Sequence, residues 1–346
     1  MRACKFSAIT ISDETGLPIF DPERCVGCGK CVEACPKGIV KLVGETTKIL
    51  HWNQYTQCLS PCRQRCPAQI NIPKYLGHAR RGEYGAALRV VKDNNPLAVA
   101  TGRVCPELCA TECRRTIKDD PLAINSIKRF LSDWERESGE RLTVPVAADT
   151  GKKVAVVGGG PSGLSAAYYL RRLGHQVDIF EQMEKLGGMP LYGIPEYRLS
   201  EEQYKWDIDG VLELGVTAHT GVKLGEDFTI RSLKAMGFDA VYLALGCWHG
   251  RMLPFEGKEL EGIYSGIDYL RPFHTDEEII KGTHYIVIGA GNVAMDCARS
   301  ALRTGAESVN LLFRFSRDLM AVSYTHLTLP TNVRECRSRW GRGDGE

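Results

Sequence analysis

The sequence has no long apolar run and no excess of charge of one sign. Its 346 residues include 44 lysines and arginines against 42 aspartates and glutamates, a net charge of +2. No lysine- or arginine-rich block interrupts the body of the chain, so we expect no nucleic-acid partner. The first residues lack the apolar stretch of a secretory signal, and no segment approaches membrane-spanning length. These absences predict a cytoplasmic protein without a membrane span.

Cysteine is abundant by contrast, and its placement is more informative than its number. Eleven of the 14 cysteines lie at or before Cys113, at short and regular spacings. In a chain without a secretory signal, this clustering favours metal binding over disulfide bonds. The later cysteines, Cys247, Cys297 and Cys336, have no patterned neighbours, so we expect them to be structural or incidental.

The residue pattern changes along the chain and predicts several domains. Residues 1–45 are cysteine-rich and punctuated by glycine, whereas residues 46–140 place apolar residues at helical intervals of three and four. A polar, proline-containing stretch at 141–151 indicates a linker. From residue 152 the pattern becomes strand, glycine turn, helix and strand, and a comparable unit begins near residue 283. This order predicts two α/β units of the Rossmann type, each with a parallel sheet.

The first cysteine cluster follows the spacing of a bacterial-type ferredoxin. Its members are Cys25, Cys28, Cys31 and Cys35, the last followed by proline. Thiolates are soft donors that suit iron–sulfur clusters, and the tight loop wraps three of them around one cubane. In this arrangement the fourth cysteine ligates the other cluster of a two-cluster ferredoxin, so we expect Cys4, rather than Cys35, to complete this [4Fe–4S] site. A structural zinc site is the alternative.

The residues around this cluster also carry a family resemblance. Ala3-Cys4-Lys5, Gly16-Leu17-Pro18 and Ala34-Cys35-Pro36 resemble the two-cluster ferredoxin portion of the Rnf-complex B subunit. In that family an earlier cysteine run ends at the position of Cys4. The resemblance implies that three earlier cysteines are missing and that Cys35 has lost its cluster. On this basis the chain is expected to begin inside a ferredoxin-type domain.

A second set of six cysteines brackets the helical region. They form two short runs, Cys58, Cys62 and Cys66, then Cys105, Cys109 and Cys113. Over residues 57–134 the chain resembles the N-terminal iron–sulfur domain of the glutamate synthase small subunit and dihydropyrimidine dehydrogenase. The resemblance implies an α-helical domain that generally carries two [4Fe–4S] clusters.

Two clusters would need eight ligands, and this domain has only six cysteines. An earlier cysteine expected near Gln54 or Tyr55 is absent, and Lys128 replaces a glutamine or glutamate of the relatives. A protonated lysine has no lone pair to offer iron. We therefore expect at least one cluster and leave a second open, with a zinc-stapled helical domain as the alternative.

The first dinucleotide unit begins with a buried-strand pattern at 153–157. The glycine fingerprint Gly158, Gly160 and Gly163 follows, and then a helix. These glycines permit a tight turn, close approach of the backbone to a pyrophosphate, and close packing of helix on strand. The helix N-terminus presents its positive end to the phosphates. The next strand ends in Glu181, which is placed to accept hydrogen bonds from a ribose.

The cofactor of this unit is assigned by resemblance. Glu184-Lys185-Leu186-Gly187-Gly188-Met189, the motif Gly193-Ile194-Pro195-Glu196 and residues 239–247 resemble the FAD domain of the glutamate synthase small-subunit family. The resemblance is nearly continuous from residue 152 to about 320. It implies FAD, with Gly187 and Gly188 among its contacts, in a first half-domain over 152–250.

The second dinucleotide unit occupies 251–321 and includes a strand at 284–288, directly before its glycine fingerprint. Its fingerprint is Gly289, Gly291 and Ala294, and alanine is permitted at the third position. The following strand ends in Arg314 rather than an acid, with Arg317 close behind. Arginines at this position suit the 2′-phosphate of NADP, which we favour over NAD. Solvated surface arginines are the alternative.

Together the family resemblances imply an NAD(P)H-dependent flavo-iron–sulfur oxidoreductase. Electrons would pass between NAD(P)H, FAD and the clusters, in either direction, because flavin handles both hydride and single-electron transfer. The outer partner would be a ferredoxin-like acceptor or a partner redox subunit. We nominate no catalytic acid, base or nucleophile. A non-catalytic electron-transfer or docking subunit is the alternative.

The last residues break the family pattern. Residues 323–332 resemble translated sequencing-adapter read-through, and the remainder is rich in arginine and glycine without apolar periodicity. We therefore expect 322–346 to be a non-native or disordered tail and the NAD(P)-binding domain to be incomplete. The expected behaviour of such a chain is retention of clusters, weak FAD binding and no NADPH-dependent dye reduction.

Overall fold

The computed structural model describes part of the chain in detail: residues 7–11, 18–21, 24, 31, 34, 59–250 and 252–313. The chain divides into two units, Met1–Leu59 and Ser60–Glu346. In the first unit, β1 (Ile9–Ile11) pairs antiparallel with β2 (Pro18–Phe20). Among the described residues, no helix is long and apolar enough to cross a membrane.

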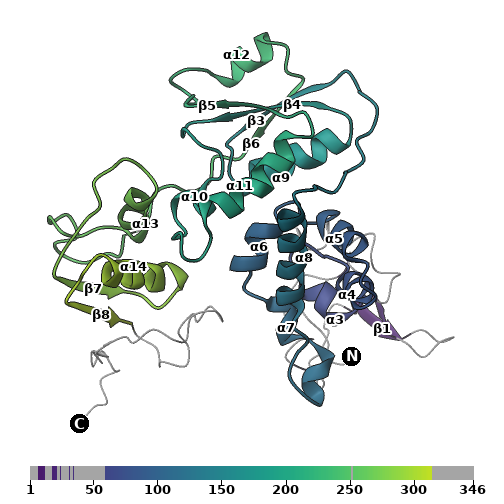
Figure 1. Ribbon diagram of the computed structural model, residues 1–346, viewed down its shortest axis with the longest axis horizontal. Helices are drawn as coiled ribbons and strands as arrows, with labels where there is room; N and C mark the ends of the chain where they lie inside the picture. Colours follow the sequence, from purple (N-terminus) through teal and green to yellow (C-terminus); the bar gives the residue numbers. More distant parts are fainter. Residues whose placement is uncertain are drawn as a thin grey trace. The chain divides into compact units, whose positions relative to one another are not determined.

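The second unit opens with an all-helical domain, as the apolar periodicity predicts (Figure 1). Its elements are α3 (Pro61–Arg65), α4 (Ile72–Arg80), α5 (Tyr84–Lys92), α6 (Ala98–Val104), α7 (Leu108–Thr111), η1 (Arg114–Ile117) and α8 (Ile124–Ser138). The helical pattern over 74–91 is interrupted where Gly82 adopts a φ of +76°, so α4 and α5 fold back on each other. Tyr75, Leu88 and Leu131 fill the core of this domain.

The chain then forms a four-stranded parallel sheet with the order β5-β4-β3-β6. Its elements are β3 (Lys153–Val157), α9 (Pro161–Arg172), β4 (Gln176–Glu181), α10 (Met189–Tyr192), α11 (Glu201–Leu212), β5 (Thr217–Thr220), α12 (Ile230–Ala235) and β6 (Ala240–Leu243). Val157 of β3 lies opposite Phe180 of β4. The order and the parallel register are those expected of a Rossmann-type unit.

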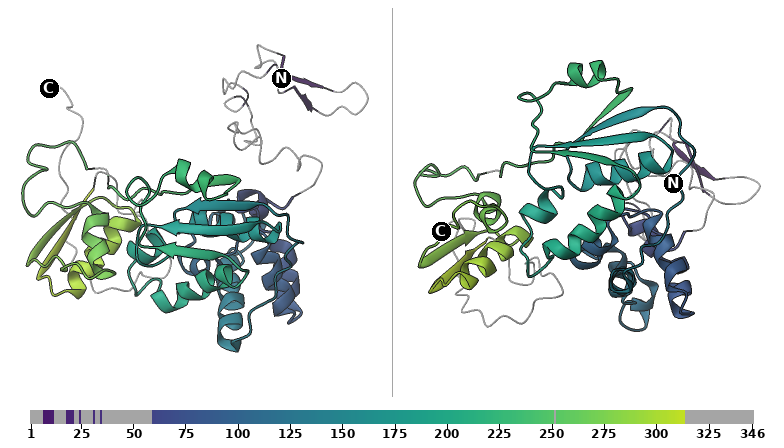
Figure 2. Two further views of the ribbon diagram at one scale, coloured as in Figure 1. Left: turned by 90° about the horizontal axis from the view of Figure 1, so that it is seen from above. Right: turned by 45° about the horizontal axis from the view of Figure 1, so that its top comes forward.

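Both faces of this sheet are covered, which explains the continuous apolar run of β3. Val156 and Ile179 pack towards α9 and α11, whereas Ala155 and Phe180 pack towards the side of α12. Figures 1 and 2 show these layers, with α12 on one side of the sheet and α9 and α11 on the other. Because helices cover both faces of the sheet, a ligand can approach it at the strand ends, where the glycine turn lies.

The second α/β region has a smaller sheet. It comprises α13 (Gly266–Leu270), η2 (Arg271–Phe273), β7 (His284–Ile288), α14 (Asn292–Arg303) and β8 (Ser308–Leu312). The strands β7 and β8 are parallel, and α14 connects them as the fingerprint predicts. Val309 and Leu311 are buried against α14, while Ile286 is 73% exposed on the other face.

Candidate dinucleotide and cluster sites

In the first glycine turn, backbone segments lie so close together that a side chain at Gly158 or Gly163 would not fit between them. Gly158 has a φ of +110°, and a Cβ added there would lie 2.2 Å from the carbonyl oxygen of Ala244. A Cβ added to Gly163 would lie 1.8 Å from the carbonyl oxygen of Gly158. The two positions therefore serve the tight turn and the helix-on-strand packing predicted for them.

A second pair of glycines forms the cradle at the start of α9. Gly160 precedes the helix, and its nearest neighbour on that side is the backbone of Gly188, 3.6 Å from an added Cβ. The loop bearing Gly188 is tied to the turn by a hydrogen bond from the Gly187 N–H to the Gly159 carbonyl, 2.9 Å long. Bare backbone beside a helix N-terminus suits a pyrophosphate. The residues present therefore fit the dinucleotide that the fingerprint predicts.

Gly187 has a structural explanation beyond any cofactor contact. Its φ is +138°, and an added Cβ would lie 2.8 Å from the Cβ of Leu191 and 3.1 Å from the Tyr204 ring. The residue lets the loop pass tightly over α10 and α11. The sequence resemblance treats Gly187 and Gly188 alike. In the structure, Gly187 is needed for packing, whereas Gly188 lines the cradle.

Glu181 lies at the end of β4, where the ribose-binding acid was predicted. Its side chain is buried, and its two carboxylate oxygens accept hydrogen bonds from the N–H groups of Gly159 (2.6 Å) and Met183 (2.9 Å). Each oxygen keeps a second lone pair, so ribose hydroxyls can still donate to it. The carboxylate thus connects the glycine turn to the adjacent loop and remains chemically suited to a ribose.

The second glycine turn is more open than the first. Gly289 has a φ of +133°, and its N–H donates to the Leu312 carbonyl over 2.9 Å. A Cβ added to Gly291 would meet nothing within 4 Å, and Ala294 is buried under the helix start. The space in front of Gly291 fits a phosphate approaching the N-terminus of α14. Arg314 and Arg317, the predicted 2′-phosphate ligands, lie outside the described residues.

In the helical domain, four cysteines gather around one buried tyrosine. Tyr75 is 1% exposed, and its hydroxyl donates to the Ile124 carbonyl over 2.8 Å. Burial raises the pKa of Tyr75, and four neighbouring thiols raise it further. These thiols belong to Cys109, Cys66, Cys62 and Cys105. The structure thus brings together members of both cysteine runs, which are about forty residues apart in the sequence.

The ionisation of these thiols bears on whether they can bind a metal cluster, because the thiolate is the form that binds metal. Burial raises the pKa of the Cys109 thiol to about 11, and Cys105 and Cys66 add to this effect, while Lys128 opposes it. A thiol of this kind stays protonated at neutral pH unless a metal ion takes the place of its proton. Cys113 is also buried, at the start of η1. In the part of the chain that the structure describes, no three histidine, cysteine, aspartate or glutamate side chains lie close enough together to hold a metal ion.

Several predicted ligands cannot be placed. Cys4, Cys25, Cys28, Cys35 and Cys58 lie outside the described residues, and Cys31 is described without its neighbours in the cluster. The ferredoxin-type site therefore stays a prediction. Sequence reasoning did not single out Tyr75, although its spacing of three from Ile72 on α4 places both on the buried face of that helix.

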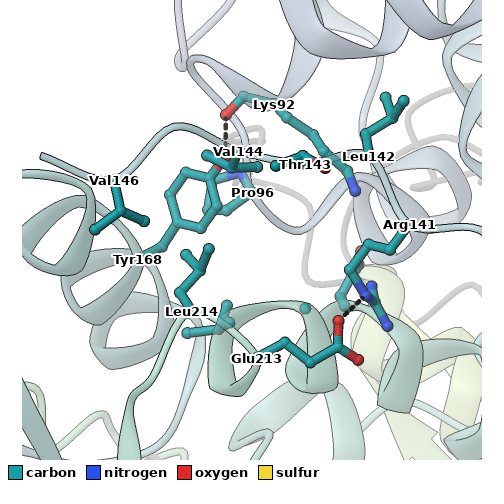
Figure 3. Close-up of a pocket in the computed structure, with 13 residues that line it drawn as sticks. Lys92, Pro96, Arg141, Leu142, Thr143, Val144, Val146, Tyr168, Glu213 and Leu214 are labelled. Atoms are coloured by element: carbon teal, nitrogen blue, oxygen red, sulfur yellow. Dashed lines mark hydrogen bonds and ion pairs between the residues drawn. The ribbon is translucent and has the colours of Figure 1, made fainter.

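A cavity of about 330 Å³ lies where the helical domain and the linker meet α9 and α11 (Figure 3). Arg141 and Glu213 in its wall form an ion pair of 2.7 Å, and the Tyr168 hydroxyl donates to the Lys92 carbonyl over 3.2 Å. The Lys92 ammonium is bound by Glu135 over 2.6 Å. Because these cations already have carboxylate partners, the cavity is not suited to an anionic cofactor.

Comparison with known families agrees with the site geometry. The pyridine nucleotide-disulphide oxidoreductase family model matches residues 135–193 and 152–326, more than half of the chain. The chain belongs to this family. The model of dihydropyrimidine dehydrogenase domain II, a 4Fe-4S cluster domain, matches residues 40–140, and a 4Fe-4S binding domain model matches residues 18–41. The predicted 4Fe–4S domains and dinucleotide oxidoreductase fold are confirmed, while the number of clusters stays a prediction.

The chain is also similar to several curated proteins. It is 38% identical over 292 residues to the NADP(+)-dependent formate dehydrogenase subunit beta of Moorella thermoacetica, covering 78% of this chain and 41% of that protein. It is 39% identical over 266 residues to the NADPH-Fe(3+) oxidoreductase subunit beta of Geobacter sulfurreducens, covering 75% and 39%.

The predicted resemblance to the glutamate synthase small subunit is confirmed as well. The chain is 34% identical over 300 residues to the glutamate synthase [NADPH] small chain of Bacillus subtilis, covering 81% of this chain and 60% of that protein. In each case the chain spans less than two thirds of the relative's length.

Proposed function

We propose that this chain belongs to an NAD(P)H-dependent flavo-iron–sulfur oxidoreductase. It relays electrons between NAD(P)H, FAD and [4Fe–4S] clusters, and onward to or from a ferredoxin-like acceptor or a partner redox subunit. The observation that carries the proposal is the junction between the helical domain and the first dinucleotide unit. This junction connects α6, the helix that ends directly before Cys105, to α11 of the first dinucleotide unit.

The junction is built on a buried carboxylate. Asp207 of α11 accepts hydrogen bonds from the N–H groups of Val99 (3.2 Å) and Ala100 (2.8 Å), in the first turn of α6. The other end of α6 is followed directly by Cys105. At 1.5 Å per residue, seven residues span about 10 Å, so a cluster ligand lies one short helix away from the dinucleotide unit. This proximity suits electron transfer between two cofactors.

Further side chains fix the same junction. The Arg103 guanidinium of α6 donates to Gln203 of α11 over 2.7 Å and to Asp133 of α8 over 2.6 Å. Arg103 is thereby held between the two domains. An electron relay benefits from such fixed contacts because the protein's contribution is the orientation of its cofactors.

The predicted residues divide between shaping the site and binding. Gly158 and Gly163 shape the turn, Gly160 would face the FAD pyrophosphate, and Glu181 would bind the ribose. Gly289, Gly291 and Ala294 would receive the nicotinamide nucleotide, with NADP favoured over NAD by Arg314 and Arg317. When bound, FAD exchanges hydride with the nicotinamide and single electrons with the clusters. The cytoplasm suits this chemistry because its reducing conditions keep cysteine ligands from forming disulfides.

The test is anaerobic purification of the 346-residue chain followed by iron, sulfide and flavin analysis. With FAD supplied in excess, the chain should contain iron, sulfide and flavin, and dithionite should bleach both the flavin bands and the brown iron–sulfur absorbance. Iron–sulfur colour with no flavin binding would instead favour the non-catalytic electron-transfer or docking subunit. Zinc without iron would contradict both.

Matched cysteine variants sharpen this experiment. Cys109→Ser should lower the iron and sulfide content, because Cys109 is buried among the other thiols. Cys247→Ser is the control, because Cys247 is exposed and distant in sequence from both cysteine runs. Equal iron content in the two variants would remove Cys109 from the cluster site.

A further inference from the structure

A short segment of the first dinucleotide unit reaches the helix of the second. We name residues 193–200 the bridge segment. Both ends of the segment are anchored in the core of the first dinucleotide unit. Leu199 is 2% exposed within this core, and Ile194 packs against it. Between these anchors, Tyr197 and Arg198 contact α14. The bridge segment is therefore rooted in one unit and contacts the other.

The central contact is a buried ion pair. The Arg198 guanidinium lies 2.5 Å from the Asp296 carboxylate, and their side chains are 8% and 4% exposed. The Tyr197 hydroxyl donates to the backbone carbonyl of Asp296 over 3.3 Å. About two turns further along α14, the Arg303 guanidinium lies 3.8 Å from the centre of the Tyr197 ring. Two consecutive residues of the bridge segment thus grip one face of α14.

Some buried polar atoms at this contact have no hydrogen-bond partner. In this respect the contact differs from a well-packed protein core, where buried polar atoms are hydrogen-bonded. Asp296 Oδ1 is buried and has no hydrogen-bond partner among the described residues. The Nε2 atom of His274 is likewise buried without a hydrogen-bond partner among the described residues. His274 belongs to the second dinucleotide unit and lies near Ile194. Burial raises the pKa of Asp296 despite the adjacent Arg198. The contact therefore bears an uncompensated cost of desolvation.

This energetic balance suits a contact that forms and separates. The desolvation of a buried ion pair offsets much of its Coulomb attraction, so the pair fixes geometry more than it adds stability. If the units part, both charges regain water, which compensates for the lost contact. Two arrangements of similar free energy are what a switch between domains requires.

The position of Asp296 connects this contact to the nucleotide site. The helix α14 begins at Asn292, directly after Gly291 of the second glycine turn, and Asp296 lies in its second turn. A group that fixes Asp296 therefore fixes the turn that receives the nucleotide phosphates. We propose that the Arg198–Asp296 pair is an interdomain latch that positions the second dinucleotide unit over the first and releases it when the pair separates. This inference rests on the proposed function for its consequence in electron transfer, but not for the latch itself.

The first test measures the latch without any cofactor reaction. Hydrogen–deuterium exchange is compared for the 346-residue chain and for Arg198→Met and Asp296→Asn. Both substitutions should accelerate exchange in the bridge segment and in α14 together. The charge-exchanged double variant, R198D with D296R, should restore part of the protection. Unchanged protection of α14 in both single variants, with folding verified by circular dichroism, would overturn the latch.

A matched control uses an ion pair of similar length that lies within one helix. Lys205 and Asp209 of α11 are 2.6 Å apart, and their side chains are 64% and 35% exposed. Lys205→Met should leave exchange in the bridge segment and α14 unaltered. If it accelerates exchange there as much as Asp296→Asn does, the effect is general loosening and the latch is wrong.

The second test separates positioning from nucleotide binding. Asp296→Asn should leave the Kd for NADPH within twofold of the unaltered chain while it accelerates hydrogen–deuterium exchange in α14. A tenfold or greater loss of NADPH affinity would assign Asp296 to nucleotide binding and overturn its role in positioning. If the unaltered chain binds no NADPH at all, the proposed function fails, while the exchange experiment still decides the latch.

Discussion

The two dinucleotide units share one fingerprint but differ in how their strands are buried. In β3, Ala155, Val156 and Val157 are all buried, because helices and further strands surround them. In β7, the exposure alternates, and Ile286 and Ile288 are 73% and 50% exposed. The comparison shows that a strand–turn–helix pattern specifies the local turn, whereas burial of the strand depends on neighbours that the local pattern does not contain.

The glycines differ as well, in this case between positions of the fingerprint. In the first unit, an added Cβ at Gly163 would overlap the Gly158 carbonyl, so glycine is required by packing alone. In the second unit, an added Cβ at Gly291 would meet nothing within 4 Å. One fingerprint therefore combines positions needed by the fold with positions needed only by a ligand. Substitution can separate the two.

The largest effect is expected from Gly163→Ala. The new methyl group would force apart α9 and the glycine turn, at a cost of about 3 kcal/mol or more in the free energy of unfolding. Urea denaturation followed by tryptophan fluorescence measures this loss. A change below about 0.5 kcal/mol would show that the turn can relax and that the comparison between the units overstates the packing.

The strand ends give the next contrast, because Glu181 ends β4 and Arg314 follows β8. If Arg314 holds a 2′-phosphate, Arg314→Ala should weaken NADPH binding by about 1.5–3 kcal/mol, the range for a charged hydrogen bond. NADH binding should change far less. Titration of both nucleotides measures the difference, and equal losses would give Arg314 another purpose.

A third contrast is between a buried and a surface carboxyl group on α11, Asp207 and Asp209. Burial raises the pKa of Asp207 to about 7, although two backbone N–H groups and Lys92 oppose the shift. The carboxyl is therefore protonated in the folded chain below pH 7 but ionised in the unfolded chain above about pH 4. The folded state binds the extra proton, so stability should fall as pH rises from 5 towards 7, by up to about 1.4 kcal/mol per pH unit.

Asp207→Asn should flatten this pH dependence. The measurement is the free energy of unfolding at several pH values between 5 and 8, for the unaltered chain and the variant. Asp209→Asn on the same helix is the control, because the Asp209 carboxylate is paired at the surface and should leave the slope intact. A slope that persists in Asp207→Asn would assign it to another group.

The smallest effect on stability is expected from Gly291→Ala. Its φ of −81° is open to any residue, and the methyl group would face open space. The free energy of unfolding should change by no more than about 0.5 kcal/mol, while NADPH binding weakens because the methyl group obstructs the phosphate. Loss of stability as large as that of Gly163→Ala would erase the distinction between the two turns.

Much of the fold could be predicted from local pattern. The strand at 153–157, the glycine turn and the acid at Glu181 lie where the sequence placed them, because each depends on residues within one supersecondary unit. The gathering of Cys62 and Cys109 around Tyr75 was not predictable in detail, because it depends on how separate helices pack. The Arg198–Asp296 contact was missed for the same reason, since its members are 98 residues apart.

Glu135 has a consequence for where this protein can be divided. It is fully buried on α8, where it binds Lys92 and also accepts hydrogen bonds from the Leu142 N–H (2.9 Å) and the Trp206 indole (3.1 Å). A shorter chain ending at residue 140 would keep the ion pair but remove both of these donors. A buried carboxylate that loses its donors is costly. The stability of the helical domain therefore depends on contacts from the linker and from α11. Cutting the chain at this junction should destabilise the helical domain.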